Sequence, residues 1–377
     1  MPSSSFFQRS CTTFVSALLL SSVSASGSHH NHQHLHRRGF PGAATQEYQL
    51  DTEYSGNSFF DGFNFFSAAD PTHGFTDYVS RSDAQNLGLI STGNSAVIRV
   101  DSTNQYPVPS SEISYSDVDG VGRKSVRIES SKSWTYGLII ADIKHMPSAD
   151  HDGCGTWPAF WTLGSGQWPY NGEIDIIEGA NDQTETFSAG HTANQCKITP
   201  QGSGQLNYDN CNLFTTSPFG GSTNPTGCTV TAKVPNNYGA GFNANNGGVY
   251  AMEWTSNQIK TYFFPRGSIP SDISSGHPDP SKWTPFFVVG GDGQCNVDQN
   301  YRDMRIIFDT TFCGDFGSAT WGNSCAAKTG YDACYKYVPG NPQAFREAYW
   351  DVPSVKVYKL KDKTVSTTTS ATTSAVS

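Results

Sequence analysis

The stretch Asn171–Gly179, which reads NGEIDIIEG, decides how the chain folds and contains a contradiction. Its three isoleucines, bounded by glycine on both sides, are typical of a buried β-strand. Three carboxylates interrupt the same run, although a buried carboxylate is costly. Because side chains in a strand alternate between faces, Glu173 and Asp175 share one face, whereas Glu178, five positions after Glu173, belongs on the other.

A one-residue β-bulge between Asp175 and Glu178 removes the contradiction. The extra residue reverses the alternation, so that Glu178 returns to the face of Glu173 and Asp175 while Ile174 and Ile176 face the core. Two glutamates in such a row can converge on one glycosidic bond. This arrangement suits a retaining glycosidase, whose carboxyl groups lie about 5–5.5 Å apart. One carboxylate then attacks the anomeric carbon, and the other protonates the leaving oxygen and later activates water. Asp175 between them shares a proton with one partner and separates the two pKa values.

Two other interpretations of the acidic row are a calcium site and a solvated acidic edge. Calcium prefers acids and carbonyls on a flexible loop to an isoleucine-rich strand. A solvated edge has no need of isoleucine at positions 174, 176 and 177. The catalytic interpretation is therefore favoured.

Tryptophans cluster just upstream, in the run GTWPAFWTLGSGQWPYNGE, which contains Trp157, Trp161 and Trp168. Sugar rings present apolar C–H faces that stack on indoles, so this neighbourhood favours a carbohydrate substrate. Tryptophan in a strand more often belongs to a core. We expect Trp168, which lies between Gly166 and Pro169 in a loop, to be exposed and Trp157 to be buried.

Strand-like runs separated by turn residues recur along the whole chain and predict an all-β fold, with an antiparallel β-sandwich as the leading architecture. The runs begin near residues 96, 125, 137, 158, 173, 249, 259, 285, 304 and 354. Residues 255–258 join two of them as an expected hairpin. In SVRIES, Val126 and Ile128 share the face expected to be buried. Only NPQAFREAYW resembles a helix, with Asn341 as its N-cap and Pro342 at its first position.

The two ends of the chain differ from the centre in composition. Residues 1–25 resemble a secretory signal, and residues 26–38, which end in Arg37-Arg38, resemble a propeptide. Five histidines in residues 26–38 are interpreted as part of a discarded leader, since clustered histidines without a fold form no defined metal site. One catalytic domain at 39–362 and a Ser/Thr-rich tail at 363–377, with no lipid-anchor signal, complete the predicted organisation.

Cysteine usage agrees with export. An even number of cysteines remains after the signal, which predicts disulfides whose pairing the sequence leaves open. No paired C-x-x-C spacing supports zinc. The eight are Cys154, Cys196, Cys211, Cys228, Cys295, Cys313, Cys325 and Cys334.

Charge and composition narrow the class of partner. The net charge is −9, and loss of residues 1–38, which hold three arginines and no acids, makes it more negative still. We therefore expect no nucleic-acid or other polyanionic partner, and we expect no membrane association. With 13% aromatic residues, 37 glycines and 20 prolines, the composition suits a turn-rich β-protein, with a monomer as the default state.

The run GTWPAFWTLGSGQWPYNGEIDIIEGAN, followed by His191-Thr192, resembles fungal members of glycoside hydrolase family 16, in the laminarinase and endo-1,3(4)-β-glucanase branch. The resemblance extends from about residue 45 to about residue 360, and E-x-D-x-x-E is its most specific part. It implies a β-jelly-roll of two curved antiparallel sheets whose concave face forms a glucan cleft. It also implies Glu173 as the nucleophile, Glu178 as the acid/base and Asp175 as the assisting carboxylate.

The same resemblance implies that Trp161, Trp168 and His191 line the cleft. The chain departs from the pattern in FCGDFGSATWG, where Phe316 stands in place of an expected tryptophan and Trp321 lies downstream. The sequence leaves open which of these two rings, if either, faces the sugar, and we retain Trp321 as a candidate substrate-binding residue. No cofactor is required. Some family members hold a structural calcium, but no ligand set supports one in this sequence, and DHDG at 150–153 is interpreted as a turn.

The predicted function is that of a secreted, endo-acting, retaining hydrolase of β-1,3 and mixed β-1,3/1,4 glucans. The linkage comes from the resemblance and not from the physical argument. A cell-wall glucan transglycosylase and an endo-β-1,3-galactanase are alternatives on the same fold. A non-catalytic β-glucan-binding protein is the alternative of another class, and it is disfavoured because both glutamates are present.

Overall fold

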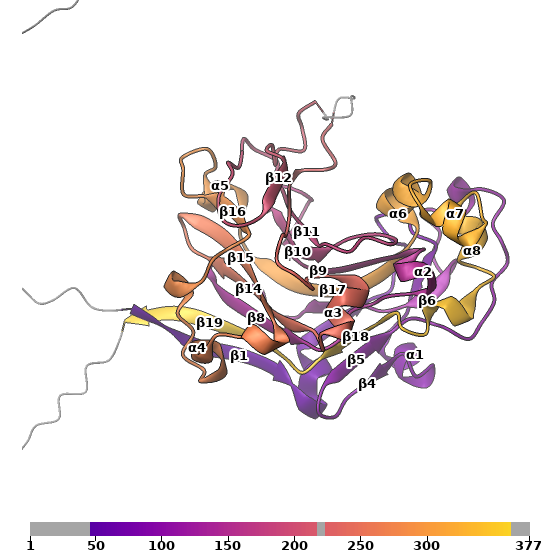
Figure 1. The fold of residues 1–377 in the computed structure, drawn as a ribbon, viewed down its shortest axis with the longest axis horizontal. Coiled ribbons are helices and arrows are strands. Elements are labelled where there is room, and N and C mark those ends of the chain that lie inside the picture. The colour runs from indigo at the N-terminus through magenta and orange to yellow at the C-terminus, as the bar shows by residue number, and fades with distance from the viewer. Residues whose placement is uncertain (1–45, 217–222, 363–377) are drawn as a thin grey trace, which may run out of the picture. The chain divides into compact units, whose positions relative to one another are not determined.

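The protein is seen in a computed structural model that describes residues 46–216 and 223–362 (Figure 1). The predicted signal, propeptide and Ser/Thr-rich tail lie outside the described residues, as do the first residues of the predicted catalytic domain. Within the described residues, no helix is long and apolar enough to cross a membrane.

Two large antiparallel sheets form the framework, which confirms the predicted β-sandwich (Figure 1). In spatial order, the six-stranded sheet consists of β1 (Gln46–Ser55), β19 (Ser354–Asp362), β8 (Gly137–Ile143), β14 (Gly248–Trp254), β15 (Gln258–Pro265) and β16 (Phe287–Gly290). The eight-stranded sheet consists of β12 (Gln205–Tyr208), β13 (Cys228–Thr231), β11 (Phe187–His191), β10 (Glu173–Glu178), β9 (Thr156–Gly164), β17 (Met304–Phe312), β7 (Arg127–Ser130) and β2 (Phe63–Phe66).

The main core lies between these sheets, because each strand buries alternate side chains toward the other sheet. Ile176 from β10 and Met252 from β14 belong to the same buried cluster. Val126 and Ile128 join it, as their alternation predicts. The expected hairpin is also confirmed: β14 and β15 are antiparallel, and the Thr255 amide donates to the Gln258 carbonyl at 2.9 Å.

The remaining strands of the described residues form smaller sheets. An antiparallel sheet contains β18 (Tyr349–Val352), β5 (Ala96–Arg99) and β4 (Ile90–Ser91), and a parallel pair contains β3 (Thr76–Tyr78) and β6 (Arg123–Ser125).

The prediction of a helix at 341–350 is wrong over most of its length. A 3₁₀ turn, η5, covers only Pro342–Phe345, and the chain then enters β18, which pairs with β5. Tertiary burial decides this outcome, because Trp350 is fully buried and its indole N–H donates to the Asp309 carbonyl at 2.9 Å.

Short helices, which the sequence pattern did not predict, connect the strands. They are α1 (Arg81–Asn86), α2 (Asp150–Gly153), α3 (Gly239–Ala244), α4 (Ser271–Ser274), α5 (Val297–Asn300), α6 (Gly314–Trp321), α7 (Cys325–Thr329) and α8 (Cys334–Tyr337), with the 3₁₀ turns η1 (Gly56–Gly62), η2 (Glu112–Ser114), η3 (Arg266–Ser268) and η4 (Pro280–Lys282). Of these, α6, α7 and α8 form a lobe at one end of the eight-stranded sheet (Figure 1).

Candidate active site

β10 carries the three acids near the centre of the eight-stranded sheet, between β9 and β11. Against β9, Asp175 pairs with Trp161 and Ile177 pairs with Phe160, so two residues of β10 advance for one residue of β9. Ile176 is therefore the extra residue of a β-bulge. The register against β11 shifts over the same segment, between Asp175 and Glu178.

The bulge places hydrophobic and acidic side chains on opposite faces of the strand. Ile174, Ile176 and Ile177 are fully buried in the core between the sheets. The acids therefore face away from that core, on what we call the acidic face of the eight-stranded sheet. The predicted bulge and the predicted shared face of the acids are both confirmed.

Glu173 lies between an indole and an imidazole. Trp168 Nε1 donates to Glu173 Oε2 at 2.8 Å, and His191 Nε2 lies 3.7 Å from Oε1. The Glu173 side chain is only 14% exposed. Burial, reinforced by the neighbouring Asp175, raises the pKa of Glu173 to about 8, while the imidazole and the indole favour its ionised form.

Glu178 has an indole donor of its own. Trp157 Nε1 donates to Glu178 Oε1 at 3.0 Å, and the Glu178 amide donates to Thr186 Oγ1 at 3.0 Å. Burial and the Asp175 carboxylate raise the pKa of Glu178 to about 8, and the Trp157 hydrogen bond opposes this rise. A carboxyl group that keeps its proton near neutral pH can act as a general acid.

Asp175 is the most buried of the three acids, with a side chain that is 5% exposed. Its Oδ2 lies 3.3 Å from His191 Nε2. Burial and the nearby Asp309 of β17 raise the pKa of Asp175 to about 8, and burial also raises the pKa of Asp309 to about 7. Like charges this close oppose each other's ionisation, so the pair keeps a proton near neutral pH.

His191 is held in place by a close backbone approach. Gly227 has φ +63°, and a Cβ there would lie 2.7 Å from His191 Nδ1 and 2.5 Å from the Gly190 carbonyl oxygen. Only glycine fits this position without displacing the imidazole. The structure thus brings together the five predicted residues Glu173, Asp175, Glu178, Trp168 and His191.

The three upstream tryptophans have different environments. Trp168 is 43% exposed, as predicted. The expectation that Trp157 is buried is wrong, because this residue is only partly buried and contacts Glu178. Trp161 is also partly buried, and the guanidinium of Arg127 lies 4.9 Å from its ring centre. All three point to the acidic face, since Trp161 pairs with Asp175 and alternates with its neighbours.

Trp321 is not a substrate-binding residue. Its side chain is 2% exposed, its indole N–H donates to the Tyr331 carbonyl at 2.9 Å, and its ring packs on Tyr337. No ring face is left for a sugar. Phe316 is instead partly exposed, and its ring meets that of Trp157 edge-on at 5.6 Å between centroids. Phe316 therefore lies on the Glu178 side of the site.

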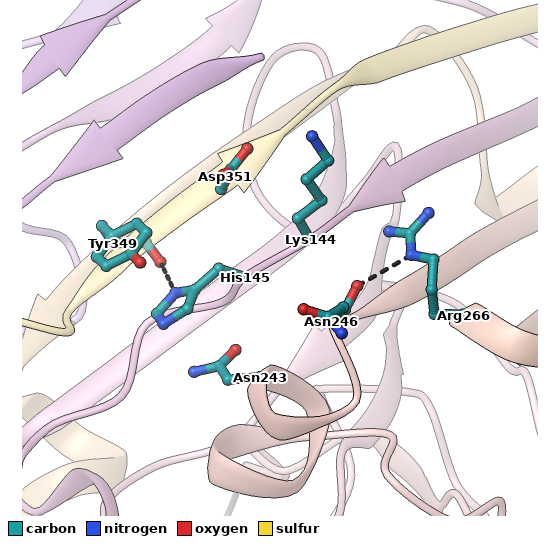
Figure 2. A pocket seen from close by; sticks show the side chains of 7 residues that line it. All are labelled: Lys144, His145, Asn243, Asn246, Arg266, Tyr349 and Asp351. Atoms are coloured by element: carbon teal, nitrogen blue, oxygen red, sulfur yellow. Dashed lines mark hydrogen bonds between the residues drawn. The ribbon is translucent and has the colours of Figure 1, made fainter. Parts of the chain in front are cut away.

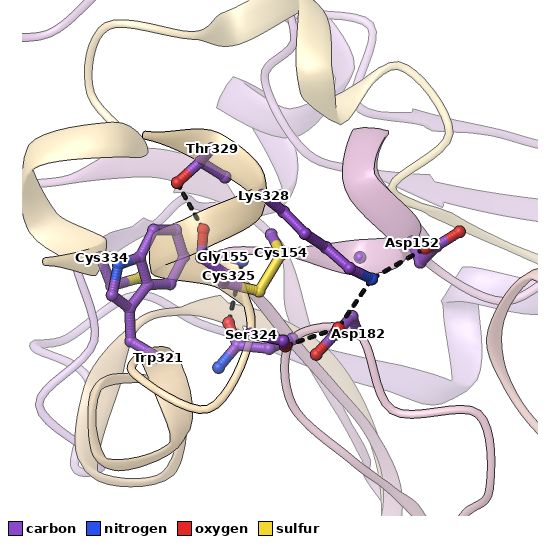
Figure 3. The surroundings of a disulfide bond; sticks show 12 residues. Asp152, Cys154, Gly155, Asp182, Trp321, Ser324, Cys325, Lys328, Thr329 and Cys334 are labelled. Atoms are coloured by element: carbon purple, nitrogen blue, oxygen red, sulfur yellow. Dashed lines mark hydrogen bonds and ion pairs between the residues drawn. A yellow bond between two sulfur atoms is a disulfide. The ribbon is translucent and has the colours of Figure 1, made fainter. Parts of the chain in front are cut away.

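Two disulfides hold the lobe of α6–α8 against the sheet. Cys154 is joined to Cys325, and Cys313 is joined to Cys334. Figure 3 shows Lys328 beside the first disulfide, where its ammonium pairs with Asp152 at 3.0 Å and Asp182 at 2.8 Å. The remaining pairs, which complete the predicted disulfide framework, are Cys196–Cys295 and Cys211–Cys228.

One group of described residues could hold a metal ion, namely Glu173, Asp175 and His191, whose ligand atoms lie within 4.8 Å of one another. Calcium prefers six to eight oxygen ligands, which this buried set with its imidazole does not supply. Asp152 of the DHDG run is engaged by Lys328. The donor chemistry at both places gives no support to a calcium site.

A separate polar cavity of about 380 Å³ lies where β8, α3 and β18 approach one another (Figure 2). None of the three acids lines it. His145 stacks on Tyr349 with 3.8 Å between ring centroids, and Arg266 pairs with Asp142 at 2.6 Å. These side chains are engaged with one another, so the cavity does not compete with the acidic face as the candidate site.

Two residues beside the acids, Arg127 and Asp309, were not predicted, and the role of a third, Phe316, was left open. Arg127 lies beneath Trp161, Asp309 lies close to Asp175, and Phe316 packs on Trp157. The alternation of SVRIES already placed Arg127 on the face opposite the core. No local signal separates Asp309 from other acids that end a hydrophobic run, because its neighbours come from a distant strand.

An antiparallel sandwich with three acids on a bulged central strand, and an indole donor on each outer acid, defines a glycoside hydrolase site. A family model described as an XgeA-like, catalytic GH16 domain matches residues 63–358. The chain belongs to glycoside hydrolase family 16.

Individual relatives agree with this assignment. The endo-1,3(4)-beta-glucanase of Arthroderma benhamiae is 42% identical over 84% of this chain and 66% of the relative. The endo-1,3(4)-beta-glucanase xgeA of Emericella nidulans is 39% identical over 85% of this chain. The chain spans between about half and two thirds of the length of these relatives, 49% in the second case.

Two solved structures are similar over most of the chain. One is described as an elongating GH family 16 beta-1,3-glucosyltransferase, with 40% identity, a TM-score of 0.72 and coverage of 83% of this chain and all of the other. The second is Laminarinase 16A from Phanerochaete chrysosporium, with beta-glucans in its donor and acceptor sites. It shows 36% identity, a TM-score of 0.72 and coverage of 84% of this chain and all of the other.

Proposed function

We propose that this protein is an endo-acting, retaining glycoside hydrolase that cleaves β-1,3 and mixed β-1,3/1,4 glucans by double displacement. The observation that carries the proposal is the placement of Glu173 and Glu178 on one face of β10, each with an indole hydrogen-bond donor. The relatives named as endo-1,3(4)-beta-glucanases support the choice of substrate.

In the first step, the Glu173 carboxylate attacks the anomeric carbon while the glycosidic C–O bond breaks. Glu178 transfers its proton to the departing oxygen, so no alkoxide is released. The Trp168 hydrogen bond and the nearby His191 favour the ionised form that Glu173 needs for attack. The raised pKa of Glu178 supplies the proton.

In the second step, Glu178 is ionised and accepts a proton from water as the water attacks the glycosyl–Glu173 ester. The ester bond breaks and the Glu173 carboxylate is regenerated, with Glu178 again protonated. Burial and the nearby Asp309 keep Asp175 protonated. Asp175 assists because its neutral form limits the negative charge beside the ester.

A neutral polymer fits the charge and the exposed rings. The chain carries −9 overall, which disfavours uronates and sulfates. Trp168 offers an exposed ring next to Glu173, on which a sugar can stack at any point along a chain, as internal cleavage requires. Four disulfides support the proposed secretion.

A transglycosylase is the second candidate, because a solved relative with 40% identity is described as a glucosyltransferase. The two reactions share the first step and differ only in whether water or a sugar hydroxyl attacks the ester. Sizing the products from laminarin, lichenan, cellulose and β-1,3-galactan separates them. Shorter products from laminarin and lichenan support the hydrolase, products longer than a supplied oligosaccharide support transfer, and products from galactan alone identify a galactanase.

Replacement of each glutamate tests the proposed roles. Glu173→Gln is expected to abolish turnover, by about 10⁴-fold or more, while the protein still binds laminarin. This result also distinguishes the enzyme from a non-catalytic binding protein, whose behaviour the substitution leaves unchanged. Near-normal activity in this variant contradicts the assignment.

Glu178→Ala is expected to form the glycosyl–enzyme from substrates with good leaving groups and then to stall, because no base activates water. Added azide restores turnover and yields a β-glycosyl azide. An α-product contradicts the double displacement.

A further inference from the structure

Tyr170, two residues after Trp168, and Phe214 are both exposed although their rings contact each other. Tyr170 is 48% exposed and Phe214 is 52% exposed, with 6.1 Å between their ring centroids and 48° between their planes. Large apolar groups that gather at one place on a surface mark binding sites more often than isolated ones. Neither residue is needed by the chemistry at Glu173 and Glu178.

Local hydrogen bonds hold Tyr170 in a tight turn. Its amide donates to the Gln167 carbonyl at 3.0 Å, and the Gly172 amide donates to the Pro169 carbonyl at 2.9 Å. The same turn carries Trp168, whose indole contacts Glu173. The backbone of Tyr170 is therefore held in the same turn as Trp168, two residues away, and Trp168 contacts the acidic face.

The chain around Phe214 is anchored to the other side of the same site. The Phe214 amide donates to Asn212 Oδ1 at 2.8 Å, and Cys211 is joined to Cys228 of β13. Thr192, the residue after His191, donates to the Cys211 carbonyl and accepts from the Leu213 amide, both at 2.9 Å. Phe214 is thus tied to the strand that carries His191.

We propose that Tyr170 and Phe214 form an outlying stacking surface for further glucosyl units of a β-glucan whose scissile bond lies at Glu173. This inference rests on the proposed function. It specifies that the site prefers long glucans to short oligosaccharides. The rings of Trp168 and His191 lie 6.1 Å apart, Tyr170 follows Trp168 by two residues, and Phe214 follows the segment that is hydrogen-bonded to Thr192. A glucan that extends from Glu173 past these two segments is therefore expected to meet both rings. Because the turn and the disulfide already order the rings, binding sacrifices little conformational entropy.

The test compares long and short substrates in Tyr170→Ala/Phe214→Ala. The ratio of kcat/KM for laminarin to kcat/KM for laminaritriose is expected to fall about tenfold, the factor that corresponds to one or two lost ring contacts. Leu50→Ala is the control, since Leu50 is equally exposed but lies on β1 of the other sheet. An unchanged ratio in the double variant overturns the inference.

Affinity electrophoresis through laminarin separates this inference from the proposed function. In the Glu173→Gln background, Tyr170→Ala/Phe214→Ala is expected to migrate with less retardation, while Leu50→Ala migrates as the background does. Equal retardation of all three proteins overturns the stacking surface. Inactivity of the unsubstituted protein on every β-glucan overturns the proposed function, and the electrophoresis still decides whether the rings bind laminarin.

Discussion

Glu173 and Glu178 are chemically identical side chains in one buried cluster, and each has a raised pKa. The different roles proposed for them must come from their neighbours. Glu173 lies 3.7 Å from His191 and receives the Trp168 indole, whereas Glu178 receives the Trp157 indole. His191 opposes the rise in the pKa of both glutamates. A hydrogen bond to a carboxylate stabilises the ionised form, so each indole lowers the pKa of one glutamate.

The two indoles provide matched variants for the pH profile. In Trp157→Phe the pKa of Glu178 rises because its ionised form loses a donor, and the basic limb of kcat/KM moves up by about one pH unit. In Trp168→Phe the pKa of Glu173 rises, and the acidic limb moves up instead. The pH dependence of kcat/KM between pH 3 and 10 measures both shifts. Movement of the same limb in both variants contradicts the assigned roles.

The positions of individual side chains could be predicted where neighbours along the sequence determine them. They could not be predicted where contacts with distant residues determine them. The E-x-D-x-x-E spacing identifies the acids because strand alternation and one bulge suffice to align them. Trp157 and Trp321 were misplaced because a tryptophan in a strand or a helix carries no local sign of its partner. Their surroundings come from Glu178 in the first case and from Tyr331 and Tyr337 in the second.

At the element scale, the bulge at Ile176 is what makes β10 compatible with both a core and an acidic row. Two consecutive isoleucines fill the core, and the alternation resumes in time for Glu178 to pair with Ala159 of β9. The pairing of β10 with β9 on either side of the bulge does not depend on the extra residue. The number of residues between Asp175 and Glu178, and not their identity, therefore determines which face Glu178 occupies.

Changes in strand length test this view. Deletion of Ile176 leaves the run E-I-D-I-E, which alternates strictly and keeps both glutamates on the acidic face. We expect the variant to fold with a loss of about 2–5 kcal/mol, as for loss of a large buried side chain, and to stay within about 10²-fold of the parental kcat. Urea unfolding and laminarin hydrolysis measure the two quantities.

The control is the opposite change. Insertion of one alanine after Ile176 leaves the run E-I-D-I-A-I-E, which also alternates without a bulge and keeps Glu178 on the acidic face. It moves Glu178 two positions, or about 7 Å, farther along β9 from Glu173 than in the parent, so activity should fall to the level of Glu178→Ala. If the deletion is as inactive as the insertion while remaining folded, the bulge itself, and not only the shared face, is required for catalysis.

Strands were predictable and helices were not, for a physical reason. The strands carry alternating or continuous apolar runs that reflect the two sheets packed against them. The lobe of α6–α8 has no such pattern, because two disulfides and buried rings order its short helices. Disulfide pairing depends on which distant segments meet, and residues 154 and 325 are separated by 171 positions. The helix expected at 341–350 yielded to pairing between β18 and β5.

For the whole molecule, the buried acidic cluster makes the stability of the fold depend on pH. Glu173, Asp175, Glu178 and Asp309 are buried, and each has a pKa well above its ordinary value. The folded protein thus binds more protons than the unfolded chain between about pH 4 and pH 8. The stability that these groups contribute is fully present below the unfolded pKa values and is lost as the pH rises through about 8.

Asp175→Asn is the variant that isolates this effect, because an amide has nearly the same shape and does not ionise. Its Tm relative to that of the parent should rise as the pH increases from 5 to 8, by about 2–4 °C for each kcal/mol relieved. Asp61→Asn serves as the control, since that carboxylate is 64% exposed and pairs with Arg81 on the surface. Calorimetry at several pH values measures the differences. A constant difference between Asp175→Asn and the parent across this range shows that Asp175 is ionised throughout and contradicts the proton-sharing role assigned to it.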